Sequence, residues 1–70
     1  MTSRQKDCLN FVEKFWKKNG YSPSYDEIRE GIRLKSKSGV HALVARLVAQ
    51  GYLLKEDRRA RSLRPAHPSA

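Results

Sequence analysis

The stretch that decides the fold runs from Ser36 to Gly51 and reads SKSGVHALVARLVAQG. Its larger apolar residues recur at steps of three and four, which is the spacing of one face of an α-helix. Ser36 is a typical N-cap residue and Gly51 a typical residue just after a helix end, so a helix is predicted between them. The predicted apolar face consists of Val40, Leu43, Val44, Leu47 and Val48.

Two further helices are predicted upstream, each opened by a capping box in which two residues satisfy each other's backbone N–H groups. Thr2 and Gln5 open the first helix, and Ser24 and Glu27 open the second. A tight turn over residues 31–35 then leads into the third helix. The apolar faces consist of Cys8, Leu9, Val12, Phe15 and Trp16 in the first helix, and of Ile28 and Ile32 in the second.

The last third of the chain predicts a β-hairpin, with strands over residues 52–55 and 61–64 and a charged turn over residues 56–60. Residues 65–70 have little to bury and are predicted to form a flexible C-terminal tail. Residues 1–64 are therefore expected to form one domain. Its predicted fold class is mainly α with a small β-hairpin: a winged helix-turn-helix, in which three helices precede a two-stranded wing.

The charge of the chain is unevenly distributed. With 15 Lys and Arg against 7 Asp and Glu, the formal net charge is +8. Residues 1–32 hold six bases and five acids, whereas residues 33–64 hold nine bases and two acids, so the excess lies in the second half. Such an asymmetry in a folded chain indicates binding to a polyanion, usually nucleic acid.

Several other classes of protein are disfavoured. No apolar run approaches the ~18 residues of a membrane span, and no signal-peptide pattern opens the chain, so a cytoplasmic location is expected. Cys8 is the single cysteine, and with His41 and His67 it provides too few ligands for a zinc site within the chain. Cys8 is interpreted as a buried hydrophobe rather than a nucleophile. We expect no enzyme, no cofactor and no small-molecule substrate.

The third helix and the wing form the predicted DNA-binding surface, because the major groove admits one helix and the wing reaches the backbone. Small side chains let the helix approach the groove floor, and Ser38 and His41 offer hydrogen bonds to bases or phosphates. Ser36 and Lys37 favour a phosphate near the positive end of the helix dipole. Arginines at the wing tip are predicted to contact phosphates or the minor groove. The predicted site consists of Ser36, Lys37, Ser38, Gly39, His41, Ala42, Arg46, Arg58, Arg59 and Arg61.

Five short segments carry a resemblance to a known family. They are residues 2–5 (TSRQ), 20–24 (GYSPS), 34–41 (LKSKSGVH), 51–53 (GYL) and 61–64 (RSLR). In this order and spacing they resemble the N-terminal DNA-binding domain of LexA-type repressors, over residues 2–64. The resemblance implies a bacterial or phage transcriptional repressor, a sequence-specific double-stranded DNA-binding protein that occupies an operator of two half-sites as a dimer. It places DNA contacts at Ser36, Ser38, Gly39, His41 and Ala42, with backbone contacts from the wing tip.

The sequence departs from the family pattern at several positions. Arg29 stands where a small residue is usual, and Arg33 where a glycine is usual, with Gly31 two residues earlier. His41 and Ala42 replace an acidic pair found in some members, so the operator sequence is not expected to carry over.

The length of the chain bears on how such a repressor would be regulated. LexA-type proteins continue into a self-cleaving domain that also dimerises, whereas this chain ends at Ala70. We therefore expect no cleavage or damage-sensing role, and only weak pairing of protomers on DNA. Both a fragment of a longer repressor and a free-standing small regulator are open interpretations.

Two other functions are compatible with the composition. A winged helix also serves as a protein-interaction module, in which the basic face docks on an acidic protein. Non-specific architectural binding to DNA is a third possibility, and it would give salt dependence without a preferred sequence. Replacing Ser38 or His41 should change the preferred DNA sequence, whereas replacing Arg58 or Arg59 should weaken binding to every sequence alike.

Overall fold

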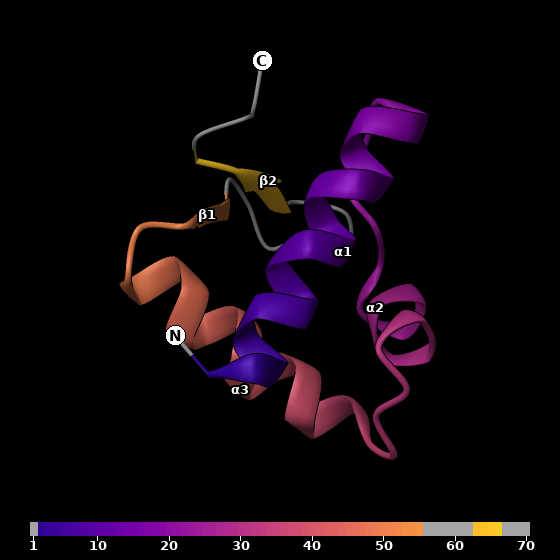
Figure 1. Cartoon of the computed structure of the whole chain (residues 1–70), viewed down its shortest axis with the longest axis vertical. Helices are drawn as coiled ribbons and strands as arrows, with labels where there is room; N and C mark the ends of the chain where they lie inside the picture. The colour runs from indigo at the N-terminus through magenta and orange to yellow at the C-terminus, as the bar shows by residue number, and fades with distance from the viewer. Residues whose placement is uncertain (1, 56–62, 67–70) are drawn as a thin grey trace.

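The computed structural model describes residues 2–55 and 63–66, and in these residues three helices precede a two-stranded hairpin (Figure 1). Each helix contacts the other two, while β2 packs on α1 and β1 packs on α3. The predicted winged helix-turn-helix is confirmed. The elements are α1 (Ser3–Asn19), α2 (Tyr25–Gly31), α3 (Lys37–Ala49), β1 (Leu53–Lys55) and β2 (Leu63–Pro65).

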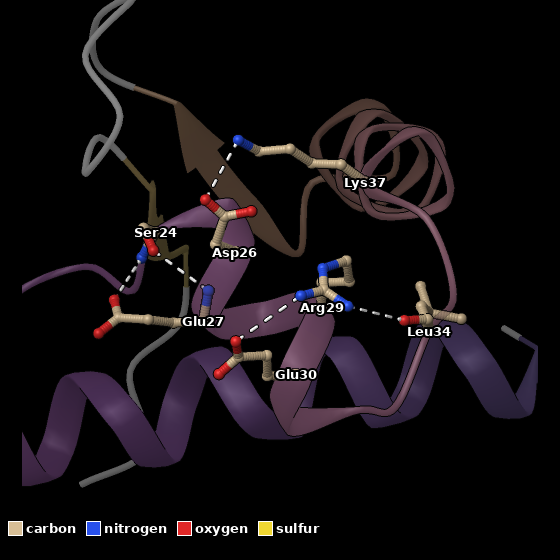
Figure 2. Close-up of polar contacts among 7 residues, drawn as sticks. All are labelled: Ser24, Asp26, Glu27, Arg29, Glu30, Leu34 and Lys37. Atoms are coloured by element: carbon tan, nitrogen blue, oxygen red, sulfur yellow. Dashed lines mark hydrogen bonds and ion pairs between the residues drawn. The ribbon is translucent and has the colours of Figure 1, made fainter.

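The helix starts follow the predicted capping pattern in two cases out of three. The Thr2 hydroxyl accepts a hydrogen bond from the Gln5 backbone N–H, and the Gln5 side chain accepts from the Thr2 N–H, both at 3.2 Å. Ser24 and Glu27 form the same reciprocal pair at the start of α2 (Figure 2). Ser36 occupies the N-cap position of α3 but makes no side-chain cap hydrogen bond, because its hydroxyl pairs with that of Ser38 at 3.1 Å.

The core is built from apolar side chains of all five elements. The predicted apolar faces of the helices supply most of it, although Phe15 and Trp16 near the end of α1 are only half-buried. Strands β1 and β2 each contribute one leucine that is almost completely buried. The core residues are Cys8, Leu9, Val12, Ile28, Ile32, Val40, Val44, Leu47, Leu53 and Leu63.

The two strands of the wing pair antiparallel, with Leu53 opposite Pro65 and Lys55 opposite Leu63. Pro65, which the sequence placed in the flexible tail, is therefore part of β2, and it is buried. Proline is tolerated there because an edge position does not require its missing N–H. The next residue, Ala66, donates its N–H to the Tyr52 carbonyl oxygen at 3.1 Å. The predicted turn over residues 56–60 and the tail residues 67–70 lie outside the described residues.

A buried serine connects the wing to the segment between α1 and α2. Ser22 is 1% exposed, and its hydroxyl oxygen accepts a hydrogen bond from the Leu63 backbone N–H at 3.1 Å. The same hydroxyl donates to the Pro23 carbonyl oxygen at 3.0 Å. This connector therefore fixes the start of β2 against the helices.

The turn between α2 and α3 differs from the prediction in where its special residue lies. Gly31 is the last residue of α2 rather than part of the turn. A Cβ atom at this position would overlap the ring of Phe11 in α1, so glycine permits the close approach of the two helices. Arg33 has φ +59°, the left-handed conformation for which glycine is the usual residue.

Backbone hydrogen bonds show why Arg33 adopts this conformation. The Leu34 N–H donates to the Arg29 carbonyl oxygen at 2.9 Å, and the Arg33 N–H donates to that of Glu30 at 3.3 Å. This pair of bonds is a Schellman motif, which requires a left-handed residue after the helix cap. The Arg29 guanidinium also donates to the Leu34 carbonyl oxygen at 3.4 Å (Figure 2). The turn thus keeps the helix-ending geometry although an arginine rather than a glycine occupies the left-handed position.

We expect the Arg33→Gly variant to be more stable than the natural sequence, with a free energy of unfolding higher by about 0.5–1 kcal/mol. Removing a left-handed non-glycine residue relieves roughly 1–2 kcal/mol, of which about 0.4–1 kcal/mol is offset by the greater freedom of glycine in the unfolded chain. Urea unfolding followed by circular dichroism measures the difference. Arg33→Ala is the matched control, since it removes the same side chain but keeps the strained conformation, and an equal gain there would contradict the explanation.

Candidate nucleic-acid interface

One face of α3 is exposed along the whole helix, opposite the face that carries Val40, Val44 and Leu47. Gly39 is half-buried, because it lies close to the Leu34 side chain of the turn. The remaining predicted site residues of α3 and its N-cap are all exposed: Ser36, Lys37, Ser38, His41, Ala42 and Arg46. The small, polar and basic side chains that the sequence predicts to bind DNA therefore lie together on the exposed surface of α3.

The start of α3 is tied to α2 by an ion pair. The Lys37 ammonium lies 3.3 Å from a carboxylate oxygen of Asp26, in the first turn of α2 (Figure 2). Both side chains are more than half exposed, so the pair contributes at most about 1 kcal/mol to stability. Its larger consequence is electrostatic, since a carboxylate stands beside one of the predicted phosphate contacts.

One turn further along α3, His41 packs against an aromatic side chain of α2. The imidazole of His41 and the ring of Tyr25 have centroids 4.4 Å apart, in an edge-on arrangement with an interplanar angle of 67°. The Lys55 ammonium of β1 lies 5.8 Å from the centroid of the same Tyr25 ring. Tyr25 therefore contacts both α3 and the wing.

A basic hollow lies beside the α2–α3 turn. It is lined by Arg4, Arg33, Lys35 and Ser36, together with the apolar Leu34 and with Gly39 of α3. The Arg4 guanidinium donates to the Ile32 carbonyl oxygen at 2.7 Å, so the start of α1 supports the turn. The positive charge of the candidate interface thus extends from α3 across the turn to α1.

The wing contributes exposed basic residues to the described structure at Lys55 and Arg64. The three arginines predicted for the wing tip, Arg58, Arg59 and Arg61, lie outside the described residues.

The structure assigns Cys8 to the core. Its side chain has no exposed surface, and burial raises the pKa of the thiol to about 11, so it stays protonated near neutral pH. The interpretation of Cys8 as a buried hydrophobe is confirmed. Among residues 2–55 and 63–66, no group of three or more His, Cys, Asp or Glu side chains is arranged to hold a metal ion. The helices of the described residues lack the length and the apolar character that a membrane-spanning segment requires.

Sequence reasoning missed three residues that the structure brings to this surface. Tyr25 and Asp26 contact α3 from the first turn of α2, and Arg4 reaches the turn from α1. No local pattern identifies these contacts, because the residues of each pair are 11 to 28 positions apart in the chain. The position of Arg4 inside the TSRQ segment was the one available signal.

The sequence matches a known family of DNA-binding domains. The model of the LexA DNA binding domain matches residues 1–62. The LexA repressor of Gluconobacter oxydans is 38% identical over 63 residues, which cover 90% of this chain and 26% of that protein. The LexA repressor of Pelagibacter ubique is 40% identical over 63 residues, covering 90% of this chain and 28% of that protein. The chain thus spans about a quarter of the length of these relatives. It belongs to the LexA DNA-binding domain family.

Proposed function

We propose that this protein is a sequence-specific double-stranded DNA-binding repressor that acts by occupying an operator. Helix α3 enters the major groove, and the basic wing contacts the backbone. The observation that carries the proposal is the exposed face of α3 in a chain of the LexA DNA-binding domain family. That face combines small side chains with basic and hydrogen-bonding ones, the combination that a helix needs to lie close to base edges.

The proposed contacts divide into two classes by their chemistry. Ser38 and His41 offer hydrogen bonds to bases, while Gly39 and Ala42 leave room for the groove floor. Ser36, Lys37 and Arg46 hold the helix against phosphates, and the wing arginines Arg58, Arg59 and Arg61 extend those contacts along the backbone. Two protomers pair weakly on adjacent half-sites, roughly one or more turns of ~10 bp apart.

Selection of binding sites from random duplexes tests this proposal. We expect a palindromic consensus, because two protomers related by a two-fold axis read two inverted half-sites. Ser38→Ala and His41→Ala should each change the base preferred at one position of the half-site. Lys35→Ala, on the adjoining turn, should weaken binding to all sequences alike. Salt-dependent binding without a consensus would indicate non-specific association, and the absence of duplex binding would reject the proposal in favour of a protein partner.

The Asp26→Asn variant is expected to bind duplex DNA about 2- to 10-fold more tightly than the natural sequence. The substitution removes a negative charge from the interface and releases Lys37 from its ion pair. The dissociation constant is measured by fluorescence anisotropy at fixed, low ionic strength, where the effect is least screened.

Glu30→Gln is the matched control, because Glu30 is also on α2 but pairs with Arg29 rather than with a predicted contact. It makes the same change of net charge. An equal gain in affinity from both variants would mean that only the total charge matters, and the role given to the Asp26 and Lys37 pair would be wrong.

A further inference from the structure

Tyr25 occupies an unusual position among the side chains around the candidate interface. It is half-buried, and its ring packs against the hydrophobic core. The same ring contacts His41 of α3 and lies under the ammonium group of Lys55 of β1. One anchored side chain of α2 thus touches one predicted base-reading residue and one basic residue of the wing.

The neighbour of Tyr25 strengthens this arrangement. Asp26 pairs with Lys37, which precedes His41 by one helical turn on the same side of α3. Two consecutive residues of α2, Tyr25 and Asp26, therefore contact side chains on two successive turns of α3, both of which the proposed function places against DNA. The first turn of α2 thus contacts the exposed side of α3, the helix that is proposed to enter the major groove.

We propose that Tyr25 is a positioning residue that determines base preference through His41. The proposal rests on the proposed DNA-binding function, which it deepens. His41 is exposed, and an exposed histidine on its own would sample several rotamers. The edge-on contact with the Tyr25 ring restricts the rotation of the imidazole. Its nitrogen atoms are then presented to the base edges of the major groove in one orientation.

This role differs from that of a residue that merely fills space. A side chain that contacts base edges discriminates between bases only if its hydrogen-bonding atoms are held in place before binding. A freely rotating side chain would form hydrogen bonds with several different base edges. The ring of Tyr25 supplies that restraint, and its hydroxyl group is not needed for it. Phenylalanine should therefore replace Tyr25 in this function, whereas leucine, which fills similar apolar space, should not.

The geometry is tested first in the DNA-free protein. The chemical shifts of the His41 ring protons are measured in the natural sequence and in the Tyr25→Phe and Tyr25→Leu variants. We expect the aromatic ring at position 25 to displace these chemical shifts from those of a histidine that has no aromatic neighbour. The displacement should be retained with phenylalanine and lost with leucine. Identical shifts in all three proteins would overturn the proposed contact without reference to DNA.

The function is then tested by competition between duplexes that differ at the position where His41→Ala changes the preference. We expect Tyr25→Leu to lower discrimination at that position by about threefold or more, and Tyr25→Phe to retain it. Tyr21→Leu is the control, since Tyr21 is an exposed aromatic that packs on Phe15 of α1. It should leave discrimination unchanged. Thermal unfolding of each variant identifies losses that come from the fold alone.

A double variant separates the two proposals. In the His41→Ala background, Tyr25→Leu should produce no further loss of discrimination, because it acts through the side chain that is already absent. A full additional loss there, or unchanged discrimination in Tyr25→Leu alone, would overturn the role of Tyr25 while leaving DNA binding intact. Failure of the natural sequence to bind any duplex would instead reject the proposed function itself.

Discussion

The Leu47→Ala variant is expected to be largely unfolded at 25 °C. Leu47 lies in the last turn of α3, has no exposed surface and belongs to the core that joins the helices to the wing. Truncating a buried leucine to alanine costs about 2–5 kcal/mol. A core of this size seldom supplies more than ~3–5 kcal/mol in total. The substitution therefore removes most or all of the stability, and loss of helical circular dichroism at 25 °C measures it.

Leu54→Ala is the matched control for this result. Leu54 is 41% exposed on β1, and its neighbour in the strand, Leu53, is the one that enters the core. We expect its free energy of unfolding to change by about 0.5 kcal/mol or less, as for most surface substitutions. If the two variants unfolded at the same temperature, the assignment of Leu47 to the core would be wrong.

The parts of the fold that could be predicted from sequence are those that depend on nearby residues. The capping boxes of α1 and α2 join residues three positions apart, so their chemistry is visible in the sequence. The apolar face of α3 is visible for the same reason, since helical periodicity acts over four residues. The hydroxyl of Ser36 was the exception, because Ser38 offers it an alternative partner two residues away.

The parts that could not be predicted depend on contacts between distant segments. Gly31 appears in the sequence as a turn residue, but it is the last residue of α2, where a Cβ atom would overlap the Phe11 ring of α1. Ser22 looks like an ordinary connector residue, yet it accepts a hydrogen bond from Leu63, 41 residues later. The candidate site divides in the same way: sequence identified the exposed residues of α3, whereas the support from Tyr25 exists only in the folded chain.

The strongest expected effect on function is the dependence of DNA affinity on salt. Five exposed basic residues on the turn, α3 and β1 are available for phosphate contacts: Arg33, Lys35, Lys37, Arg46 and Lys55. Each phosphate contact releases counterions and steepens the plot of log affinity against log salt by about 0.9. These five contacts alone predict a slope of about −4.5, and hence a loss of about 500-fold in affinity for a fourfold rise in salt. The proposed contacts of Arg58, Arg59 and Arg61 would make the slope steeper still.

Substitution of single lysines then identifies which basic residues make these phosphate contacts. Lys37→Gln should reduce the slope by about 0.9, because it removes one phosphate contact and leaves the others in place. Lys18→Gln is the control, since Lys18 is an exposed lysine in the last turn of α1, at the end of that helix away from the α2–α3 turn (Figure 1). It lowers the net charge equally but should leave the slope unchanged. Anisotropy titrations at several salt concentrations measure both slopes. Equal reductions would show that affinity follows total charge, whereas a slope near zero for the natural sequence would rule out binding through the phosphate backbone.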